Sequence, residues 1–226
     1  YNYKYNINKE IRISKYALIK DYHLVILKKL REIDSFIKEK ISNYKSKIYV
    51  DTGPVLEKQI ARKAGIGWQG RNSLIITKEY GSWIFLGIII NNLDLSPDTK
   101  CPDYCGNCHK CIESCPTNAI TENRNIDSSK CIAYWTIESK EDSFPINIKD
   151  NLQNWIYGCD ICQDVCPWNK KAKISLCNDF DLNKVLSNLT KENILNMDDE
   201  QFDEFFKDTP IARLGLKKLK RNCKMI

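Results

Sequence analysis

Seven cysteines in two runs, with an eighth between the runs, have a spacing typical of iron–sulfur ligands. The first run, Cys105–Cys115, follows the pattern C-x2-C-x2-C-x3-C and is followed by Pro116. The second run, Cys159–Cys166, follows C-x2-C-x3-C before Pro167, and Cys131 lies upstream of it. Such tight spacing holds three thiolates on one loop, while the cysteine before the proline ligates the other cluster. We therefore predict two [4Fe-4S] clusters, the first held by Cys105, Cys108, Cys111 and Cys166, and the second by Cys115, Cys131, Cys159 and Cys162.

Zinc and disulfides explain the cysteine pattern less well. Structural zinc sites typically take two separated pairs of ligands, whereas this chain places three cysteines at x2 spacing before a fourth. The cysteine count of 11 is odd and no signal-peptide pattern opens the printed sequence, so we expect reduced thiols in the cytoplasm. Cys101, Cys177 and Cys223 have no spacing partners and are expected to be ordinary thiols. Two neighbouring clusters form a path for electrons, which predicts a redox protein.

The composition is that of a globular protein with a modest positive charge. The chain has 226 residues, of which 42% are hydrophobic, and a net charge of +6. Its longest apolar run, Trp83–Ile90, is too short to span a membrane and suits a buried strand. Basic residues crowd the C-terminal end at Lys217, Lys218, Lys220, Arg221 and Lys224. Charge alone predicts a solvated helix face here, and a nucleic-acid partner would make the run a phosphate contact.

Hydrophobic periodicity and turn residues predict the elements that position these cysteines. Helices are expected at residues 21–41, from Pro54 to Gly65, and in the tail from residue 179 onward, whose last segment runs from Thr209 to Lys224. Strands are expected at residues 48–50, 73–77 and 82–91, with a turn at 79–81 joining the last two. The order is thus an α/β part, a cysteine-rich part and a short helical tail.

Several sequence blocks resemble the epoxyqueuosine reductase family. They are Val50–Glu57, Ala64–Leu74, Gly81–Gly87, Tyr157–Gln163 and Cys166–Asn169, and Ser14–Ala17 with Asp21–His23 is similar to the family's upstream motif. The match runs from about Tyr16 to Gly215, and it is specific because the cysteine runs and the Asp-Thr-Gly-Pro block occur in this order. The resemblance implies an α+β protein with a cobalamin-binding α/β core in residues 1–97, a two-cluster ferredoxin-like domain in 98–178 and a short helical tail in 179–226.

The resemblance also implies a reaction and its partners. The family reduces epoxyqueuosine to queuosine at the wobble position of tRNA, the last step of queuosine biosynthesis, with cobalamin and two [4Fe-4S] clusters. We therefore expect a monomeric, cytoplasmic oxidoreductase that binds tRNA, takes electrons from an unidentified low-potential donor and does not bind membranes. The family's N-terminal stretch and its C-terminal helical repeats are not found, so we expect a fragment or a reduced protein.

By the same resemblance, Asp51 is the proton donor for the opening epoxide. Without the resemblance, Asp51 would be interpreted as the cap of a helix that begins at Pro54, where the helix dipole lowers the pKa of a carboxylate. The glycines of Gly65–Gly70 let the backbone approach a large flat group, which the resemblance implies is the corrin ring, although Trp68 fits a core position equally well. The implied cobalamin contacts are Asp51, Gln69, Asn72, Ile75 and Leu86, and the implied substrate contacts are Tyr22, His23, Lys58, Trp135 and Thr136.

Two other functions stay open on the sequence. A reductive dehalogenase-like enzyme would use the same cofactors on a small molecule, but the basic C-terminal run and the missing export signal argue against it. A plain two-cluster electron-transfer protein would leave the Asp-Thr-Gly-Pro and Gly-Trp-Gln-Gly blocks without a purpose. Binding of cobalamin to the isolated chain would separate these functions.

Overall fold

The chain contains both helices and short strands, which confirms the predicted mixed class. The computed structural model describes residues 1–3 and 10–226. All eleven cysteines lie in this part and are free thiols. Within the same residues, no helix combines the length and the apolar character needed to cross a membrane.

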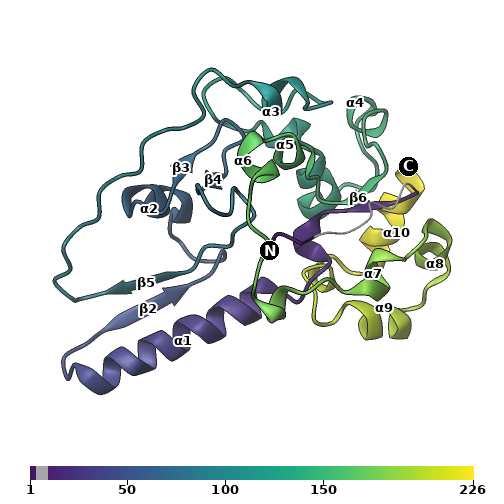
Figure 1. Cartoon of the computed structure of the whole chain (residues 1–226). Coiled ribbons are helices and arrows are strands. Elements are labelled where there is room, and N and C mark those ends of the chain that lie inside the picture. The colour runs from purple at the N-terminus through teal and green to yellow at the C-terminus, as the bar shows by residue number, and fades with distance from the viewer. Residues whose placement is uncertain (4–9) are drawn as a thin grey trace.

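A long helix and a two-stranded antiparallel ribbon form one end of the molecule (Figure 1). Helix α1 (Tyr22–Lys40) begins after Asp21, whose carboxylate accepts a hydrogen bond from the backbone N–H of His23. Strand β2 (Ser46–Tyr49) pairs with β5 (Ile88–Asn91), and both strands pack against α1. The helix predicted from the apolar periodicity is therefore confirmed.

A shorter hairpin lies between α2 (Glu57–Lys63) and the cysteine-rich loops. Its strands are β3 (Trp68–Gln69) and β4 (Ile75–Ile76). A Cβ atom at Gly67 would lie 2.2 Å from the carbonyl oxygen of Ile76, so only glycine lets the two strands approach this closely. This glycine therefore serves the hairpin itself, which differs from the predicted approach to a flat ligand.

The strands predicted at residues 73–77 and 82–91 do not form one hairpin. Strand β4 pairs with β3, whereas β5 pairs with β2 at the far end of the molecule. At the predicted turn, Thr77 and Gly81 form an isolated bridge. After this bridge, the backbone N–H of Ser82 donates a hydrogen bond to the side chain of Asn169 at 2.6 Å instead of pairing with a strand of the hairpin.

Short helices carry the cysteine-rich region. They are α3 (Lys110–Glu113), α4 (Ile146–Lys149), α5 (Ile161–Asp164) and α6 (Pro167–Lys170), and a π-helical turn spans Tyr134–Glu138. Helix α3 packs against α5, so the two cysteine runs meet. Beneath them, the buried strand β6 (Trp155–Tyr157) pairs in parallel with β1 (Arg12–Ile13).

Four helices form the tail: α7 (Lys184–Ser187), α8 (Lys191–Asn196), α9 (Asp199–Phe206) and α10 (Leu216–Met225). Helices α8 and α9 begin with reciprocal capping boxes at Thr190 and Asp198. The last helix starts later than predicted. The hydroxyl of Thr209 bonds back to the carbonyl oxygen of Phe206, and Gly215, with φ of 78°, separates a 3-10 turn from α10.

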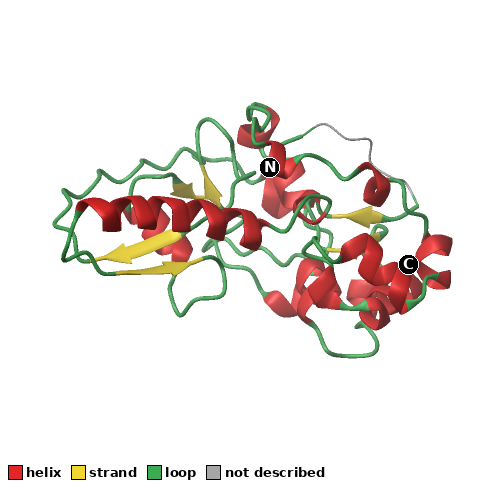
Figure 2. Cartoon of the chain, turned by 90° about the horizontal axis from the view of Figure 1, so that it is seen from below, coloured by secondary structure: helices red, strands yellow, loops and turns green. Residues whose placement is uncertain are grey.

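The largest hydrophobic core joins the beginning of the chain to the tail. Ile11 and Ile13 pack with Leu186, Phe206 and Leu219, which come from three of the tail helices. Figure 2 shows these helices gathered at one end of the molecule, with α1 and its ribbon at the other. The domain boundaries at residues 97 and 178 stay a prediction, but the core packing places the first strand with the tail.

Candidate active site with two thiol-lined cavities and a cleft

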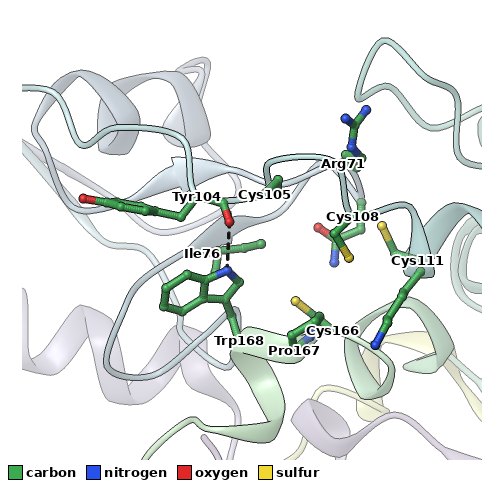
Figure 3. A pocket seen from close by; sticks show the side chains of 11 residues that line it. Arg71, Ile76, Tyr104, Cys105, Cys108, Cys111, Cys166, Pro167 and Trp168 are labelled. Atoms are coloured by element: carbon green, nitrogen blue, oxygen red, sulfur yellow. Dashed lines mark hydrogen bonds between the residues drawn. The ribbon is translucent and has the colours of Figure 1, made fainter.

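Four thiols line the first cavity, and they are the four predicted to hold one cluster: Cys105, Cys108, Cys111 and Cys166. The cavity holds about 150 Å³. In Figure 3 the sulfur atoms of Cys108, Cys111 and Cys166 point toward the same space. Cys166 is the residue before α6, whose first residue is Pro167, so the proline sets the direction from which this thiol enters.

The rest of the first cavity is polar and charged on one side. Arg71, Asn72 and Lys110 line it together with Tyr104 and Trp168. The indole N–H of Trp168 donates to the carbonyl oxygen of Tyr104 at 3.2 Å, which holds both rings at the cavity edge (Figure 3). Among the described residues, Nε of Arg71 and Nδ2 of Asn72 are buried and have no hydrogen-bond partner.

Four other thiols line a second cavity, again as predicted for one cluster: Cys115, Cys131, Cys159 and Cys162. This cavity is smaller, at about 40 Å³. Its remaining walls are almost entirely apolar and are formed by Pro116, Thr117, Ala119, Ile120, Ile126, Ile132 and Ile161. The backbone N–H of Ala119 donates to the sulfur of Cys115 at 3.3 Å.

The thiols of each cavity crowd one another. Burial raises the pKa of Cys111 to about 11, and the charges of Cys166 and Cys105 add to this rise. Burial likewise raises the pKa of Cys162 well above its usual range, followed by the charges of Cys159 and Cys131, and with a contribution from Cys111 across the two cavities. A bound metal centre deprotonates the thiols that coordinate it and balances their charge, so the two sets of four thiols fit metal clusters such as iron–sulfur clusters.

The described residues do not form a binding site for a single metal ion. In the part of the chain that the structure describes, no three His, Cys, Asp or Glu side chains converge on a point that could hold one ion. The thiols instead surround cavities.

An open cleft adjoins the first cavity. It holds about 380 Å³ and is lined by Asp51, Val55, Leu56, Glu57, Lys58, Gln59, Gln69, Ser73 and Asn125. Three residues predicted from the resemblance, Asp51, Lys58 and Gln69, are thus brought together. Polar groups line one wall, while Leu56 is exposed beside them.

The loop between β3 and β4 is a wall shared by the cleft and the first cavity. Gln69 and Ser73 line the cleft. Arg71 and Asn72, which lie between them in the sequence, line the thiol cavity. The loop between β3 and β4 therefore contributes side chains to both the cleft and the first thiol cavity.

Asp51 lies at the mouth of the cleft and does not cap a helix. The N-cap of α2 is Leu56, so the chain from Asp51 to Leu56 is a loop, and the interpretation of Asp51 as a cap is wrong. Oδ2 of Asp51 accepts a hydrogen bond from the hydroxyl of Tyr22 at 2.9 Å and lies 3.5 Å from Nε2 of His23. The predicted helix start at Pro54 is also wrong, because α2 begins at Glu57.

Tyr22 and His23 hold this carboxylate in place. Burial raises the pKa of Tyr22, and the negative charge of Asp51 raises it further, so the phenol stays protonated and keeps donating. Nδ1 of His23 lies 2.7 Å from Oδ1 of Asp21, the N-cap of α1, which leaves Nε2 directed at Asp51. Tyr22 also stacks on Phe85. The start of α1 therefore brings Tyr22 and His23, predicted as substrate contacts, together with Asp51, predicted as the proton donor.

Other predicted contacts lie elsewhere. Asn72 lines the thiol cavity, Ile75 is buried in β4, and Leu86 is half-buried outside the cleft lining. Thr136 is fully buried, and its hydroxyl donates to the carbonyl oxygen of Ile132 and accepts from the N–H of Gly158. This burial is at odds with the prediction that Thr136 contacts a substrate.

Trp135 is partly exposed and is tied to its own loop. Its indole N–H donates to the carbonyl oxygen of Ser129 at 2.7 Å, and its ring packs near Phe144. The side chain therefore rests against the wall of the cysteine-rich region, and a substrate contact by its outer face stays a prediction.

Arg221 is a structural residue whose guanidinium is occupied by protein contacts. It donates to the carbonyl oxygens of Trp135, Ser139 and Glu141 and lies over the ring of Phe144. It thereby fastens α10 to the π-helical turn. The expectation of a basic phosphate contact survives for the lysines of α10, of which Lys217 and Lys224 are exposed.

Two buried polar clusters behind the cavities were missed by the sequence reasoning. The side chain of Asn169 accepts from the N–H of Ser82 and donates to the carbonyl oxygen of Gln163, which ties α6 to the hairpin region. The carboxylate of Asp160 accepts from the hydroxyl of Ser14 and from the N–H of Lys15, which ties the second cysteine run to the start of the chain. These residues lie inside the sequence blocks that resemble the family, and those blocks were the signal that could have identified them.

Comparison with known proteins finds the same architecture. A model described as the 4Fe-4S double cluster binding domain matches residues 104–169, and one described as Epoxyqueuosine reductase QueG, DUF1730 matches residues 1–52. The epoxyqueuosine reductase of Synechocystis sp. is 43% identical over 94% of this chain and 74% of its own length.

Two solved structures resemble the chain closely. The epoxyqueuosine reductase of Bacillus subtilis, described with an aspartate-bearing catalytic loop swung out of the active site, has a TM-score of 0.90 at 30% identity over 97% of this chain. An epoxyqueuosine reductase solved with an epoxyqueuosine-modified tRNA stem loop has a TM-score of 0.88, also at 30% identity over 97% of this chain. This chain spans 59% and 60% of those two structures, respectively, which is less than two thirds of each.

Proposed function

We propose that this chain, which belongs to the epoxyqueuosine reductase family, reduces epoxyqueuosine to queuosine in tRNA. The observation that carries the proposal is the loop between β3 and β4, which lines both the cleft that holds Asp51 and a four-thiol cavity. Reduction of an epoxide to an alkene breaks both C–O bonds, takes up two electrons and two protons, and releases the oxygen as water. The reaction therefore needs electron carriers and a proton donor side by side.

The two thiol sets support two [4Fe-4S] clusters as the electron carriers. Each cavity offers four sulfur donors and no competing side-chain ligand among the residues that line it. Cubane clusters ligated by four cysteines transfer one electron at a time and reach potentials as low as roughly −700 mV. Two such clusters therefore supply the two electrons that one turnover consumes.

The cleft fits cobalamin in the chemistry of its walls. The side chains of Gln69 and Ser73 offer polar groups to a ring with peripheral amides, and Leu56, 76% exposed, offers an apolar surface at the same cleft. When bound, cobalamin supplies a low-potential metal centre that can attack carbon. Asp51 and Gln69 are the two predicted cofactor contacts that line this cleft. We keep the backbone near Ile75 and the side chain of Leu86 as more distant candidates.

Asp51 is proposed to hold the proton that the opening epoxide oxygen takes up. Its carboxylate is 52% exposed at the cleft side and receives a hydrogen bond from Tyr22, so its position is fixed while one face stays open. Nε2 of His23, 3.5 Å away, is placed to return a proton to Asp51 between turnovers. Lys58, in the same cleft, is placed to bind the substrate. The aspartate-bearing catalytic loop described for the Bacillus subtilis structure supports this role.

The tRNA partner is proposed from the solved relative that holds a modified tRNA stem loop. A base in an anticodon loop is reached by splaying it out of the stack, and the flanking phosphates are held by basic side chains. Lys217 and Lys224 of α10 are exposed and free of the contacts that occupy Arg221. A tRNA substrate and reduced thiols suit the cytoplasm, where a low-potential protein would deliver electrons to a monomeric chain.

The proposal is tested by single-turnover conversion of an anticodon stem loop that carries epoxyqueuosine. The chain is loaded anaerobically with iron, sulfide and cobalamin, reduced with excess dithionite, and the nucleoside is identified by mass spectrometry. We expect queuosine from the wild-type chain. Retention of unreduced epoxyqueuosine by a chain that has bound both clusters and cobalamin would contradict the proposed function.

A further inference from the structure

Two neighbouring N–H donors in the wall of the first cavity have no partner. Asn72 is 1% exposed, and its Nδ2 is buried without a hydrogen bond to any described residue. Nε of Arg71, the preceding residue, is in the same state. Both side chains line the cavity formed by the four thiols. Leaving a buried donor unpaired destabilises the folded protein, so two such donors at one cavity indicate an acceptor inside it.

The orientation of the Asn72 amide follows from its other end. Oδ1 accepts a hydrogen bond from the backbone N–H of Leu74 at 3.4 Å. With the oxygen turned toward this donor, the NH₂ group is left for the opposite side. Gly70 makes room for this arrangement, because a Cβ atom there would lie 2.7 Å from Oδ1 of Asn72. A larger residue at position 70 would displace Oδ1 of Asn72, so Gly70 is needed for this orientation of the Asn72 amide.

We propose that the side-chain amide of Asn72 donates a hydrogen bond to a sulfur atom of the cluster in the first cavity and thereby raises the reduction potential of that cluster. This inference rests on the proposed function, which supplies the cluster. Hydrogen bonds to cluster sulfurs are among the terms that set the potential. Reduction adds a negative charge to the cluster, so a donor stabilises the reduced form more than the oxidised form.

The second cavity provides the contrast within the same molecule. Its walls beyond the thiols are apolar except for Thr117, whose hydroxyl lies 3.6 Å from the sulfur of Cys115. No side-chain amide or charged side chain is among the residues that line it. A cluster there lacks the stabilisation that Asn72 gives, so the cluster next to the cleft is the better electron acceptor of the two.

The experiment is a redox titration of the reconstituted chain followed by electron paramagnetic resonance, with iron and sulfide measured first. Asn72→Leu removes the donor at similar size, and Asn72→Asp keeps the oxygen that Leu74 needs but replaces the donor with a carboxylate. We expect one midpoint potential to fall in Asn72→Leu and to fall further in Asn72→Asp, while the other stays in place. Thr117→Val is the matched control at the second cavity, and it should leave the potential that Asn72 governs unchanged.

A measurement on the wild-type chain tests the same hydrogen bond even if the Asn72 variants do not assemble their clusters. With ¹⁵N in the side-chain amides of asparagine, the reduced cluster should show a hyperfine coupling to ¹⁵N that disappears in Asn72→Asp. Unchanged potentials in both Asn72 variants, or no ¹⁵N coupling in the wild type, would overturn the hydrogen bond. A chain that binds far fewer than about eight iron atoms, four per cluster, would instead overturn the proposed clusters, so the two failures are distinguishable.

Discussion

Each of the two cavities is lined by four thiols, but the remaining walls of the two cavities differ. The first is roomier and carries Arg71, Asn72 and Lys110 on one side, next to the cleft of Asp51. The second is smaller and apolar, and it lies beside the buried carboxylate of Asp160. Positive charge and N–H donors stabilise an added electron, whereas an apolar wall and a nearby carboxylate oppose it.

The proposed hydrogen bond from Asn72 would give the pair of clusters a direction of electron flow. An electron at the second cluster would gain stability by moving to the first, whose cavity and the cleft are both lined by the loop between β3 and β4. The cysteine spacing thus determines which thiols line each cavity, while the side chains between and behind the cysteines make the two cavity walls different. Four sets of substitutions test how the two cavities differ.

Removing one ligand from each cavity should separate the two clusters completely. Cys166→Ser should abolish the cluster of the first cavity, and Cys131→Ser that of the second, since each thiol lines one cavity. Iron analysis should fall from about eight atoms to about four in each variant, with a different signal abolished in each. Disappearance of the same signal from both variants would mean that the eight thiols are partitioned differently.

The proton donor should matter to turnover and not to either cluster. Asp51→Asn keeps the shape of the side chain but removes its transferable proton, so single-turnover conversion should fall about 10²–10⁴-fold. Iron content, cobalamin binding and both midpoint potentials should stay unchanged. Asp94→Asn, an exposed aspartate beyond the ribbon, is the matched control. A rate near that of the wild type in Asp51→Asn would reduce Asp51 to a structural residue.

Asn169 should support the first cavity more than the second. It follows Cys166 on α6 and bonds Ser82 and Gln163 from a buried position. Asn169→Ala leaves these groups unpaired and should lower the free energy of unfolding by about 1–3 kcal/mol. Because α6 carries Cys166, the cluster of the first cavity should decay faster in air than that of the second. Equal rates of decay would show that the network does not favour one cavity.

The exposed lysines of α10 should affect neither cavity. Lys217→Ala with Lys224→Ala removes charge from the solvent side and leaves Arg221 in its contacts with Ser139 and Glu141. If both lysines meet phosphates, the plot of log Kd against log salt should flatten by roughly 0.7–0.9 for each phosphate that is no longer neutralised. Filter binding with wild type and variant side by side measures this. Superimposable curves would identify the lysines as a solvated helix face.

The sequence allowed the ligands to be grouped because cysteine spacing is a local property. Both thiol sets lie where the spacing predicted, around one cavity each. Helix α1 was predictable for a similar reason, since its apolar periodicity extends over many turns. The resemblance singled out Asp51, Tyr22 and His23 individually, but it did not predict the hydrogen bond between Tyr22 and Asp51.

Long-range pairing was not predictable from local pattern. Strand β5 pairs with β2, which lies far before it in the sequence. The turn residues around Gly81 instead predicted pairing with the strand just before the turn. The surroundings of Asn72 and Arg221 were not predictable for the same reason. The place of Asn72 depends on how the hairpin folds against α6, and the role of Arg221 depends on carbonyl groups far away in the sequence. Such roles follow from tertiary packing, which spacing does not encode.

The most direct test of this account is the redox titration of the fully reconstituted chain alongside Cys166→Ser. We expect two separate one-electron steps in the wild type, and we expect the step at the higher potential to be the one missing from Cys166→Ser. If the step that disappears is instead the one at the lower potential, the cavity beside the cleft holds the poorer electron acceptor, and the proposed direction of electron flow is wrong.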